Sequence, residues 1–280
     1  MWPANNTFDG NPALRDFVNV GLIGIILGKT TPSRFHRSFW RTLLLSDAPA
    51  PCARILQPLR VFFRHLTCKL ETKSIFLARR VKSTQIASDS VQLSVKMGYV
   101  LTISLVARGL ARNGEYASEN APPASRMDLM EYDCQAEQVA LNHVRSCDRI
   151  PAPPIARPGY SENIHVLATA ATDVLGAIQN AIVMFTNELA ANGIPSNMIL
   201  TPQVVQRTQR TVTRVTKVLW GSNRFVGCAT VLCRGFYFTS CMYRNPVNVV
   251  GQSIYTIGAV CSTCPTGPHN CNPAIGLCSY

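Results

Sequence analysis

Residues 218–243 read VLWGSNRFVGCATVLCRGFYFTSCMY, and this stretch decides the fold. It holds two apolar runs, Phe225–Leu232 and Phe236–Tyr243, separated by the three residues Cys-Arg-Gly. Both runs are rich in Val, Phe, Tyr and Thr, which favour strands, and a three-residue connection with a glycine is typical of a hairpin with a bulged turn. Cys228 and Cys241 lie on opposite arms, close enough for a disulfide. The stretch therefore predicts the central antiparallel strand pair of a secreted, disulfide-bonded domain.

The basic character of the chain is concentrated in its first third. The net charge of the 280 residues is +12, and residues 1–96 carry 14 Lys or Arg against 5 Asp or Glu. Such a segment is either a solvated arm or a surface that binds nucleic acid or an acidic membrane. Because basic and aromatic residues are not interleaved there, the pattern favours the arm, and we expect no nucleic-acid partner.

The cysteines are concentrated in the opposite part of the chain. Of the 11 cysteines, Cys52 and Cys68 are in the first third, and the other nine lie from Cys134 onward. Nine in this part indicate an oxidising compartment and therefore secretion. An odd number leaves at least one without a partner in that part. Since no apolar run approaches the length of about 20 residues that spans a bilayer, we expect no membrane span.

Hydrophobic periodicity predicts the elements before the hairpin. Asp173 is a helix N-cap, and Gly193 ends the same helix. His143 shares a helix face with apolar residues, which is typical of a packed or half-buried histidine rather than of a ligand. The predicted elements are helices over 100–112, 127–147 and 173–192 and a short strand over 164–168.

The last four cysteines, Cys261, Cys264, Cys271 and Cys278, have the spacing Cys-x2-Cys-x6-Cys-x6-Cys. Two interpretations fit this spacing, a knot of two disulfides and a site for one zinc ion held by four thiolates. The oxidising compartment favours disulfides.

Seven segments in sequence order resemble the CAP (SCP) superfamily, and within it the nematode venom-allergen-like or activation-associated secreted proteins. The resemblance covers about residues 100–280. The segments are LVARGLARNG (105–114), 130–147, YSENI (160–164), FTNEL (185–189), VLWGSNRFVGC (218–228), CMYRN (241–245) and IYTIGAVCSTC (254–264).

The resemblance implies the fold and the domain organisation. The family fold is an α+β, α-β-α sandwich with a small antiparallel sheet between helical layers, followed by a cysteine-rich hinge. We therefore expect a basic extension of unassigned structure over 1–96, a CAP domain over 97–250 whose first helix is degenerate, and a hinge over 251–280.

The resemblance also implies where the family's cleft lies. That cleft carries two glutamates and two histidines. One glutamate is Glu162 in Ser-Glu-Asn, and the other is Glu188 in Phe-Thr-Asn-Glu. Arg214 occupies the place of one histidine, and Lys217 replaces a glutamine of the same motif. The other histidine belongs to the start of the domain, which is replaced in this sequence.

This substitution changes the chemistry expected of the cleft. Two imidazoles with carboxylates could bind a divalent transition metal, whereas arginine stays protonated and is not a ligand. We therefore expect Arg214 to form a charge-assisted pair with Glu162 or Glu188, and we expect no metal, no cofactor and no catalytic residue. A structural alternative for Glu162 is that it accepts backbone N–H bonds.

For the disulfides, the family pairs Cys228 with Cys241. Hinges of this type pair the first cysteine with the third and the second with the fourth, which gives Cys261–Cys271 and Cys264–Cys278. The pairing of Cys52, Cys68, Cys134, Cys147 and Cys233 stays open.

The function implied is that of a secreted, non-catalytic protein that acts on host or other extracellular partners. Two alternatives come from other functional classes. The first is an extracellular lipid or sterol carrier, and the second is a hydrolase that uses Glu162 and Glu188. The hydrolase has little support, because no nucleophile–base pair is visible in the sequence.

Overall fold

The computed structural model describes residues 78–265 and 270–280. The predictions for the basic arm up to residue 77, with Cys52 and Cys68, lie outside the described residues.

The predicted hairpin forms the centre of a four-stranded sheet. Strand β4 (Phe225–Leu232) pairs with β5 (Tyr237–Arg244), and Cys228 lies directly opposite Cys241. The turn between them contains Gly235 with a φ of 82°, a left-handed conformation that glycine adopts without steric cost. The second arm begins one residue later than the predicted arm.

Two further strands extend this sheet, in the order β2-β4-β5-β3. Strand β3 (Tyr160–Leu167) pairs antiparallel with β5, and β2 (Glu131–Tyr132) pairs parallel with β4. The predicted strand over 164–168 was too short. Residues 160–163, with which β3 begins, are polar or aromatic, and their pairing with β5 is a long-range contact.

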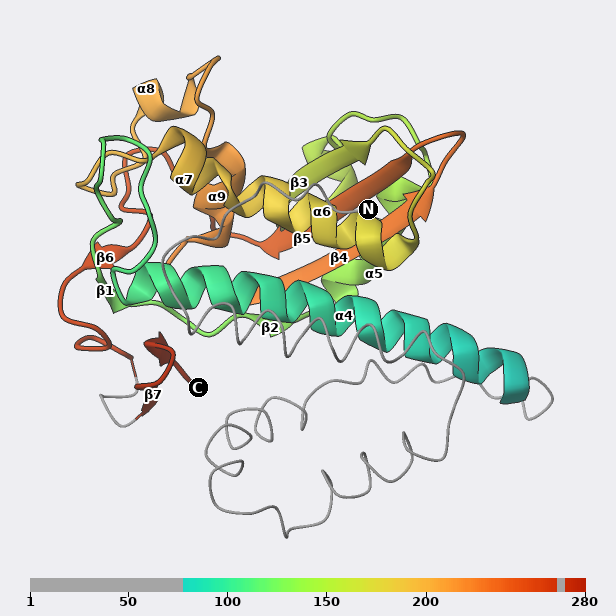
Figure 1. Ribbon diagram of the computed structural model, residues 1–280, viewed down its shortest axis with the longest axis horizontal. Helices are drawn as coiled ribbons and strands as arrows, with labels where there is room; N and C mark the ends of the chain where they lie inside the picture. Colours follow the sequence, from blue (N-terminus) through green and yellow to red (C-terminus); the bar gives the residue numbers. More distant parts are fainter. Residues whose placement is uncertain (1–77, 266–269) are drawn as a thin grey trace, which may run out of the picture. The chain divides into compact units, whose positions relative to one another are not determined.

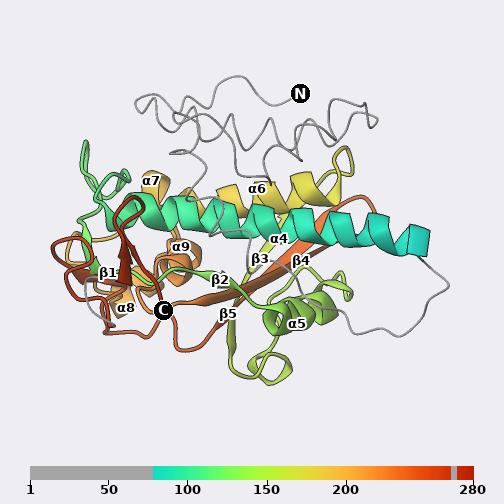
Figure 2. The same ribbon diagram turned by 90° about the horizontal axis from the view of Figure 1, so that it is seen from below.

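Helices cover both faces of the sheet. Helices α4 (Ala78–Ala107) and α6 (Val174–Thr186) lie on one side, and α5 (Cys134–Val144) lies on the other (Figures 1 and 2). This three-layer arrangement confirms the α-β-α sandwich. Because side chains alternate along a strand, neighbouring residues of β3 point to different helical layers.

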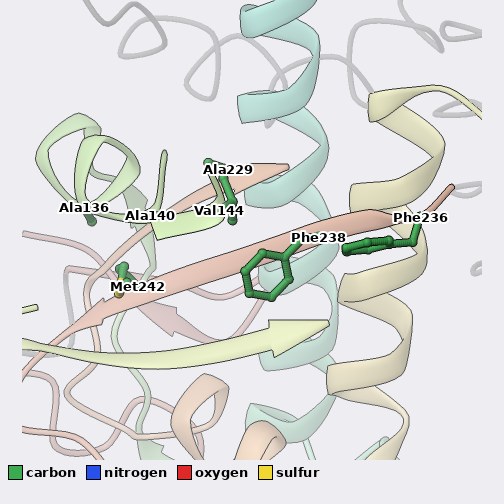
Figure 3. Packing of buried hydrophobic residues seen from close by; sticks show 7 residues of the cluster. All are labelled: Ala136, Ala140, Val144, Ala229, Phe236, Phe238 and Met242. Atoms are coloured by element: carbon green, nitrogen blue, oxygen red, sulfur yellow. The ribbon is translucent and has the colours of Figure 1, made fainter. Parts of the chain in front are cut away.

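The layer between α5 and the sheet is a compact apolar cluster. Phe238 and Met242 of β5 belong to this cluster together with residues of α5, and Phe236, which directly precedes β5, extends it (Figure 3). The buried members of the cluster are Ala136, Ala140, Val144, Ala229, Phe236, Phe238 and Met242.

Helix α4 differs most from the sequence prediction. It begins 22 residues earlier than the predicted helix and ends at Ala107 rather than at residue 112. Its end is set by Gly109, which has a φ of 68°, and by the bond from the Leu110 N–H to the Leu105 carbonyl at 2.8 Å. This is the usual glycine C-terminal arrangement. The expected boundary between residues 96 and 97 falls inside α4.

Helix α5 is shorter than the predicted helix over 127–147, and that prediction was wrong at its start. Asp133 is the N-cap, and its Oδ1 accepts the N–H groups of Gln135 and Ala136. The residues before it form β1 (Ala124–Arg126) and β2 instead.

Four helices follow β3 in the chain. Asp173 caps α6 through the Gly176 N–H, as predicted, but the predicted helix over 173–192 is two helices. Its second part is α7 (Glu188–Asn192), which ends at Gly193. The helices α8 (Pro202–Val205) and α9 (Thr213–Val218) precede the hairpin.

Four disulfides join described cysteines. Three of them are the pairs that the resemblance implies, Cys228–Cys241, Cys261–Cys271 and Cys264–Cys278. The fourth, Cys147–Cys233, ties the end of α5 to the hairpin turn. The tail also forms short strand pairs, β1 with β6 (Thr256–Ile257) and β7 (Cys271–Asn272) with β8 (Leu277–Cys278). The tail is therefore a disulfide knot.

Two stretches of the described residues, 89–107 and 174–192, are long and apolar enough to cross a membrane by length and composition. Both belong to helices that pack on the sheet, and the core helix of a soluble protein passes the same test. The absence of a membrane span therefore stays a prediction.

Candidate functional site

The two glutamates that were predicted to line the cleft make their hydrogen bonds in different parts of the structure. Glu188 is the first residue of α7 and is buried. Its Oε2 accepts the N–H groups of Arg214 and Val215, each at 3.0 Å, and its Oε1 lies 3.6 Å from Nη1 of Arg214. Glu188 therefore caps the first turn of α9 and pairs with its arginine.

Glu162 points to the other face of the sheet, toward α5. Its Oε1 accepts a hydrogen bond from Ser240 Oγ at 2.6 Å and bonds with Nδ1 of His143. Its Oε2 accepts the N–H of Ala152 at 2.7 Å. The structural alternative for Glu162, acceptance of a backbone N–H, is thus what the structure contains. Within the described residues, Arg214 forms its ion pair with Glu188 and none with Glu162.

On the face toward α4 and α6, a chain of polar side chains leads away from α9. Nζ of Lys217 donates to Oδ1 of Asn163 at 3.1 Å, and Nδ2 of Asn163 donates to Oη of Tyr243 at 3.0 Å. The hydroxyls of Tyr243 and Tyr99 share a hydrogen bond of 2.8 Å. Helix α4 therefore contributes a tyrosine to this region.

Burial and neighbouring charges shift the pKa values of these groups. Burial, the largest cause, lowers the pKa of Lys217 to about 8. Arg157 and Arg214 lower it further, while Glu188 and Glu162 raise it. Burial also raises the pKa of Glu188, against the opposing effects of its backbone bonds and of Arg214. Both charged groups are thus less stable here than in water.

Lys217→Gln is expected to remove a pH-dependent part of the stability. Because the folded pKa of Lys217, about 8, is below its ordinary value of 10.5, folding disfavours the charged amine. This cost is complete near pH 7 and shrinks as the pH rises above 8. The free energy of unfolding of the wild type should gain about 2 kcal/mol relative to the variant between pH 7 and 9.5.

Urea unfolding at the two pH values measures this difference. Arg214→Gln is the comparison variant, since arginine itself does not titrate in this range. It should keep most of the pH dependence, because burial rather than Arg214 is the largest cause of the lowered pKa of Lys217. If wild type and Lys217→Gln change in parallel with pH, Lys217 is not buried as described.

The donors present do not fit a divalent metal. Both oxygens of Glu162 and the buried Oε2 of Glu188 already accept hydrogen bonds, and Arg214 stays protonated and cannot be a ligand. Within residues 78–265 and 270–280, no group of three His, Cys, Asp or Glu side chains converges as a metal site would require.

Sequence reasoning found Glu188 and Arg214 together but missed three other residues. Lys217 was noted only as a replacement, and Tyr99 and Tyr243 were not considered. His143 was predicted to be packed or half-buried, and it is half-buried, but its bond to Glu162 was not foreseen. The sequence did contain a signal that Glu162 lies apart from the Lys217 and Tyr243 side. Glu162 and Asn163 are adjacent in a strand, and adjacent strand residues face opposite sides of the sheet.

Comparison with known families gives one match. Residues 106–243 match the model of the cysteine-rich secretory protein family, CAP.

Three relatives show the extent of the similarity. The chain is 31% identical to the solved structure of NaASP2 with Zn2+, with a TM-score of 0.63, over 68% of this chain and 95% of that one. It is 35% identical to the Ancylostoma secreted protein of Ancylostoma caninum over 63% of this chain, and 26% identical to the hookworm platelet inhibitor 1 of the same organism over 50%. The chain covers 41% and 62% of the lengths of these last two proteins.

Proposed function

This chain belongs to the cysteine-rich secretory protein family, and we propose that it is a secreted, non-catalytic protein that binds a host or other extracellular protein. The observation that carries the proposal is the use of the two family carboxylates. Glu188 caps α9 and pairs with Arg214, and Glu162 accepts a hydrogen bond from the Ala152 N–H. Both carboxylates are therefore engaged in holding the fold rather than left free for acid–base work.

The alternative of a hydrolase lacks a competent nucleophile in this region. Ser240, His143 and Glu162 are close together, but the serine and the histidine both bond to the carboxylate rather than to each other. Activation of serine requires its own bond to the base. Ser240 is also 0% exposed, so a substrate cannot reach it.

Secretion is supported by the disulfides. Four of them connect described cysteines, including one that crosses the central hairpin at Cys228 and Cys241. Disulfides of this density persist in oxidising compartments and are rare in the cytosol.

A protein partner is supported by the loop over residues 148–159. Ile155 is 90% exposed and Ile150 is 60% exposed, so the loop offers apolar side chains to solvent. The loop is fixed at its base, because Arg157 Nε donates to the Ala152 carbonyl at 2.9 Å and Ala152 donates to Glu162. Exposed apolar groups on a fixed loop favour protein binding, since little ordering is needed.

Among the relatives, the name of hookworm platelet inhibitor 1 describes an inhibitor of platelets. For this chain that name supports only the general class of an extracellular target, because half of the chain is matched.

The second candidate is an extracellular carrier of lipid or sterol. Its sequence support is the apolar faces of the helices. A methyl group added at Gly98 of α4 would lie 2.9 Å from Cγ2 of Ile182 in α6. The two helices are thus in close contact at this point, which leaves no space there for a ligand and favours the protein partner.

Affinity purification from extracellular fluid with the full chain as bait, followed by titration of the captured protein, tests the proposal. We expect saturable binding that Ile155→Asp weakens by about tenfold or more, because a central apolar contact typically contributes this much. Tyr116→Asp is the matched control, since Tyr116 is 61% exposed outside the loop.

Other results would support the alternatives. Stoichiometric lipid or sterol in an organic extract of the purified protein, without saturable protein binding, would show a carrier. Hydrolysis of an ester or peptide that Glu188→Gln abolishes would show an enzyme.

A further inference from the structure

Two cations lie on one face of α9 with donors to spare. Arg214 and Lys217 are three residues apart, a spacing that places side chains next to each other on a helix. The side chain of Arg214 is 44% exposed, and its described partner, Oε1 of Glu188, is 3.6 Å away, which is too far for a hydrogen bond. The guanidinium therefore keeps its N–H donors for another group.

Lys217, like Arg214, has a donor that no described acceptor uses. Its ammonium donates to Oδ1 of Asn163 at 3.1 Å and to the Thr213 carbonyl at 2.9 Å, and both acceptors are neutral. An ammonium has three donors, so one is left over within the part of the chain that the structure describes. Burial lowers the pKa of this amine, as expected for a cation without a bonded anion.

The neighbouring carboxylates do not accept the spare donors of Arg214 and Lys217. Glu188 directs Oε2 to the backbone of α9, and Glu162 is bonded on the opposite face of the sheet. Arg157 adds a third positive charge that acts on Lys217. The three cations therefore outnumber the two carboxylates, and Arg214 and Lys217 keep N–H donors that no described carboxylate oxygen accepts.

Asn163 holds the Lys217 ammonium and the backbone of Arg214 in place. Its Oδ1 accepts from Lys217, and its Nδ2 donates to the Arg214 carbonyl at 3.0 Å and to Tyr243. The side chain of Asn163 is buried in β3, which is a rigid support. Such preorganised donors bind an oxyanion without much reorganisation.

We propose that Arg214 and Lys217 form a binding site for a small oxyanion, a phosphate or carboxylate group, at the place where the family has its histidine-containing cleft. Arginine supplies a planar fork of donors, and lysine supplies a point charge, which together are the usual protein partners of such groups. The site goes beyond the proposed function and does not depend on a protein partner.

Pyridoxal 5′-phosphate is a suitable probe, because it carries an oxyanion and an aldehyde on one small molecule. The neutral Lys217 amine attacks the aldehyde carbon, a C–N bond forms, and water leaves to give an imine. Borohydride then delivers a hydride to that carbon while water protonates the nitrogen, so the tag becomes permanent. Peptide mapping of the full chain identifies which of the six lysines is tagged.

Pyridoxal lacks the phosphate, and its free 5′-hydroxyl also closes on the aldehyde to a hemiacetal, which slows tagging of every lysine. The preference for pyridoxal 5′-phosphate over pyridoxal should therefore be about tenfold larger at Lys217 than at Lys96, since one charge-assisted bond contributes this much. Arg214→Gln should remove most of the difference. Lys96, which is buried in α4, is the internal comparison, since its preference should reflect only the hemiacetal and should not depend on Arg214. An equal preference at Lys217 and Lys96 would overturn the proposal. Lys217→Gln should lose the tag at this position.

Protection experiments distinguish the two oxyanion sources. Inorganic phosphate that slows tagging of Lys217 indicates a phosphate site, and succinate that does so indicates a carboxylate site. Equal rates with the two aldehydes, or equal rates in wild type and Arg214→Gln, would overturn the proposal. Circular dichroism of each variant verifies that it is folded.

Discussion

Replacing Gly227 with alanine is expected to destabilise the domain by about 3 kcal/mol or more, because the added methyl group overpacks a rigid contact. Gly227 lies in β4 and faces α5. A Cβ at this position would lie 2.1 Å from the Glu137 nitrogen and 2.4 Å from the Asp133 carbonyl oxygen. Both are backbone atoms at the capped start of α5, so no side chain can rotate away. The helix has to move off the sheet.

Urea unfolding of the purified variant measures this cost. Gly235→Ala is the control, since Gly235 lies in the turn of the same hairpin with no atom within 4 Å of an added Cβ. Its positive φ should cost about 1 kcal/mol through backbone strain alone. If both variants lose the same small amount, α5 does not lie as close to β4 as described.

The hairpin could be predicted from the sequence because its signals are local. Each arm has its own strand-forming residues, and the glycine of the turn is within three residues of both. The N-cap at Asp173 was found for the same reason. In each case the residues that determine the structure are neighbours in the chain.

The start of α5 could not be found in this way. Met127 and Asp128 fit a helical pattern, but the following strand β2 pairs with Phe225 and Val226 in β4, almost a hundred residues later. Such a contact has no local signature. Asp133 carried a usable signal as an N-cap residue, which the longer apolar pattern obscured.

The candidate site was predictable to the extent that motifs mark it. Glu188 and Arg214 were placed by the resemblance, and the structure places them together. The use of each carboxylate depends on packing partners such as His143 and Ala152, which motif spacing does not reveal. The spare donors of Lys217 become visible only when all of its neighbours are known.

Glu188→Ala is expected to cost about 2 to 4 kcal/mol of stability, because it leaves the buried N–H groups of Arg214 and Val215 without an acceptor. Glu188→Gln keeps an oxygen that can accept these bonds and removes a charge whose burial raises the pKa of the carboxyl. We expect this variant to lose about 1 kcal/mol, the usual net value of a hydrogen bond. Urea unfolding at pH 7 measures both variants.

Arg214→Gln separates the cap from the ion pair. Because the Arg214 side chain is 44% exposed and lies 3.6 Å from Glu188, its pair should contribute less than about 1 kcal/mol. The expected order of loss is therefore Glu188→Ala, then Glu188→Gln, then Arg214→Gln. A loss in Arg214→Gln as large as in Glu188→Ala would mean that the ion pair dominates. The role of Glu188 would then be to neutralise the arginine rather than to cap α9, and Arg214 would have fewer donors free for a bound oxyanion.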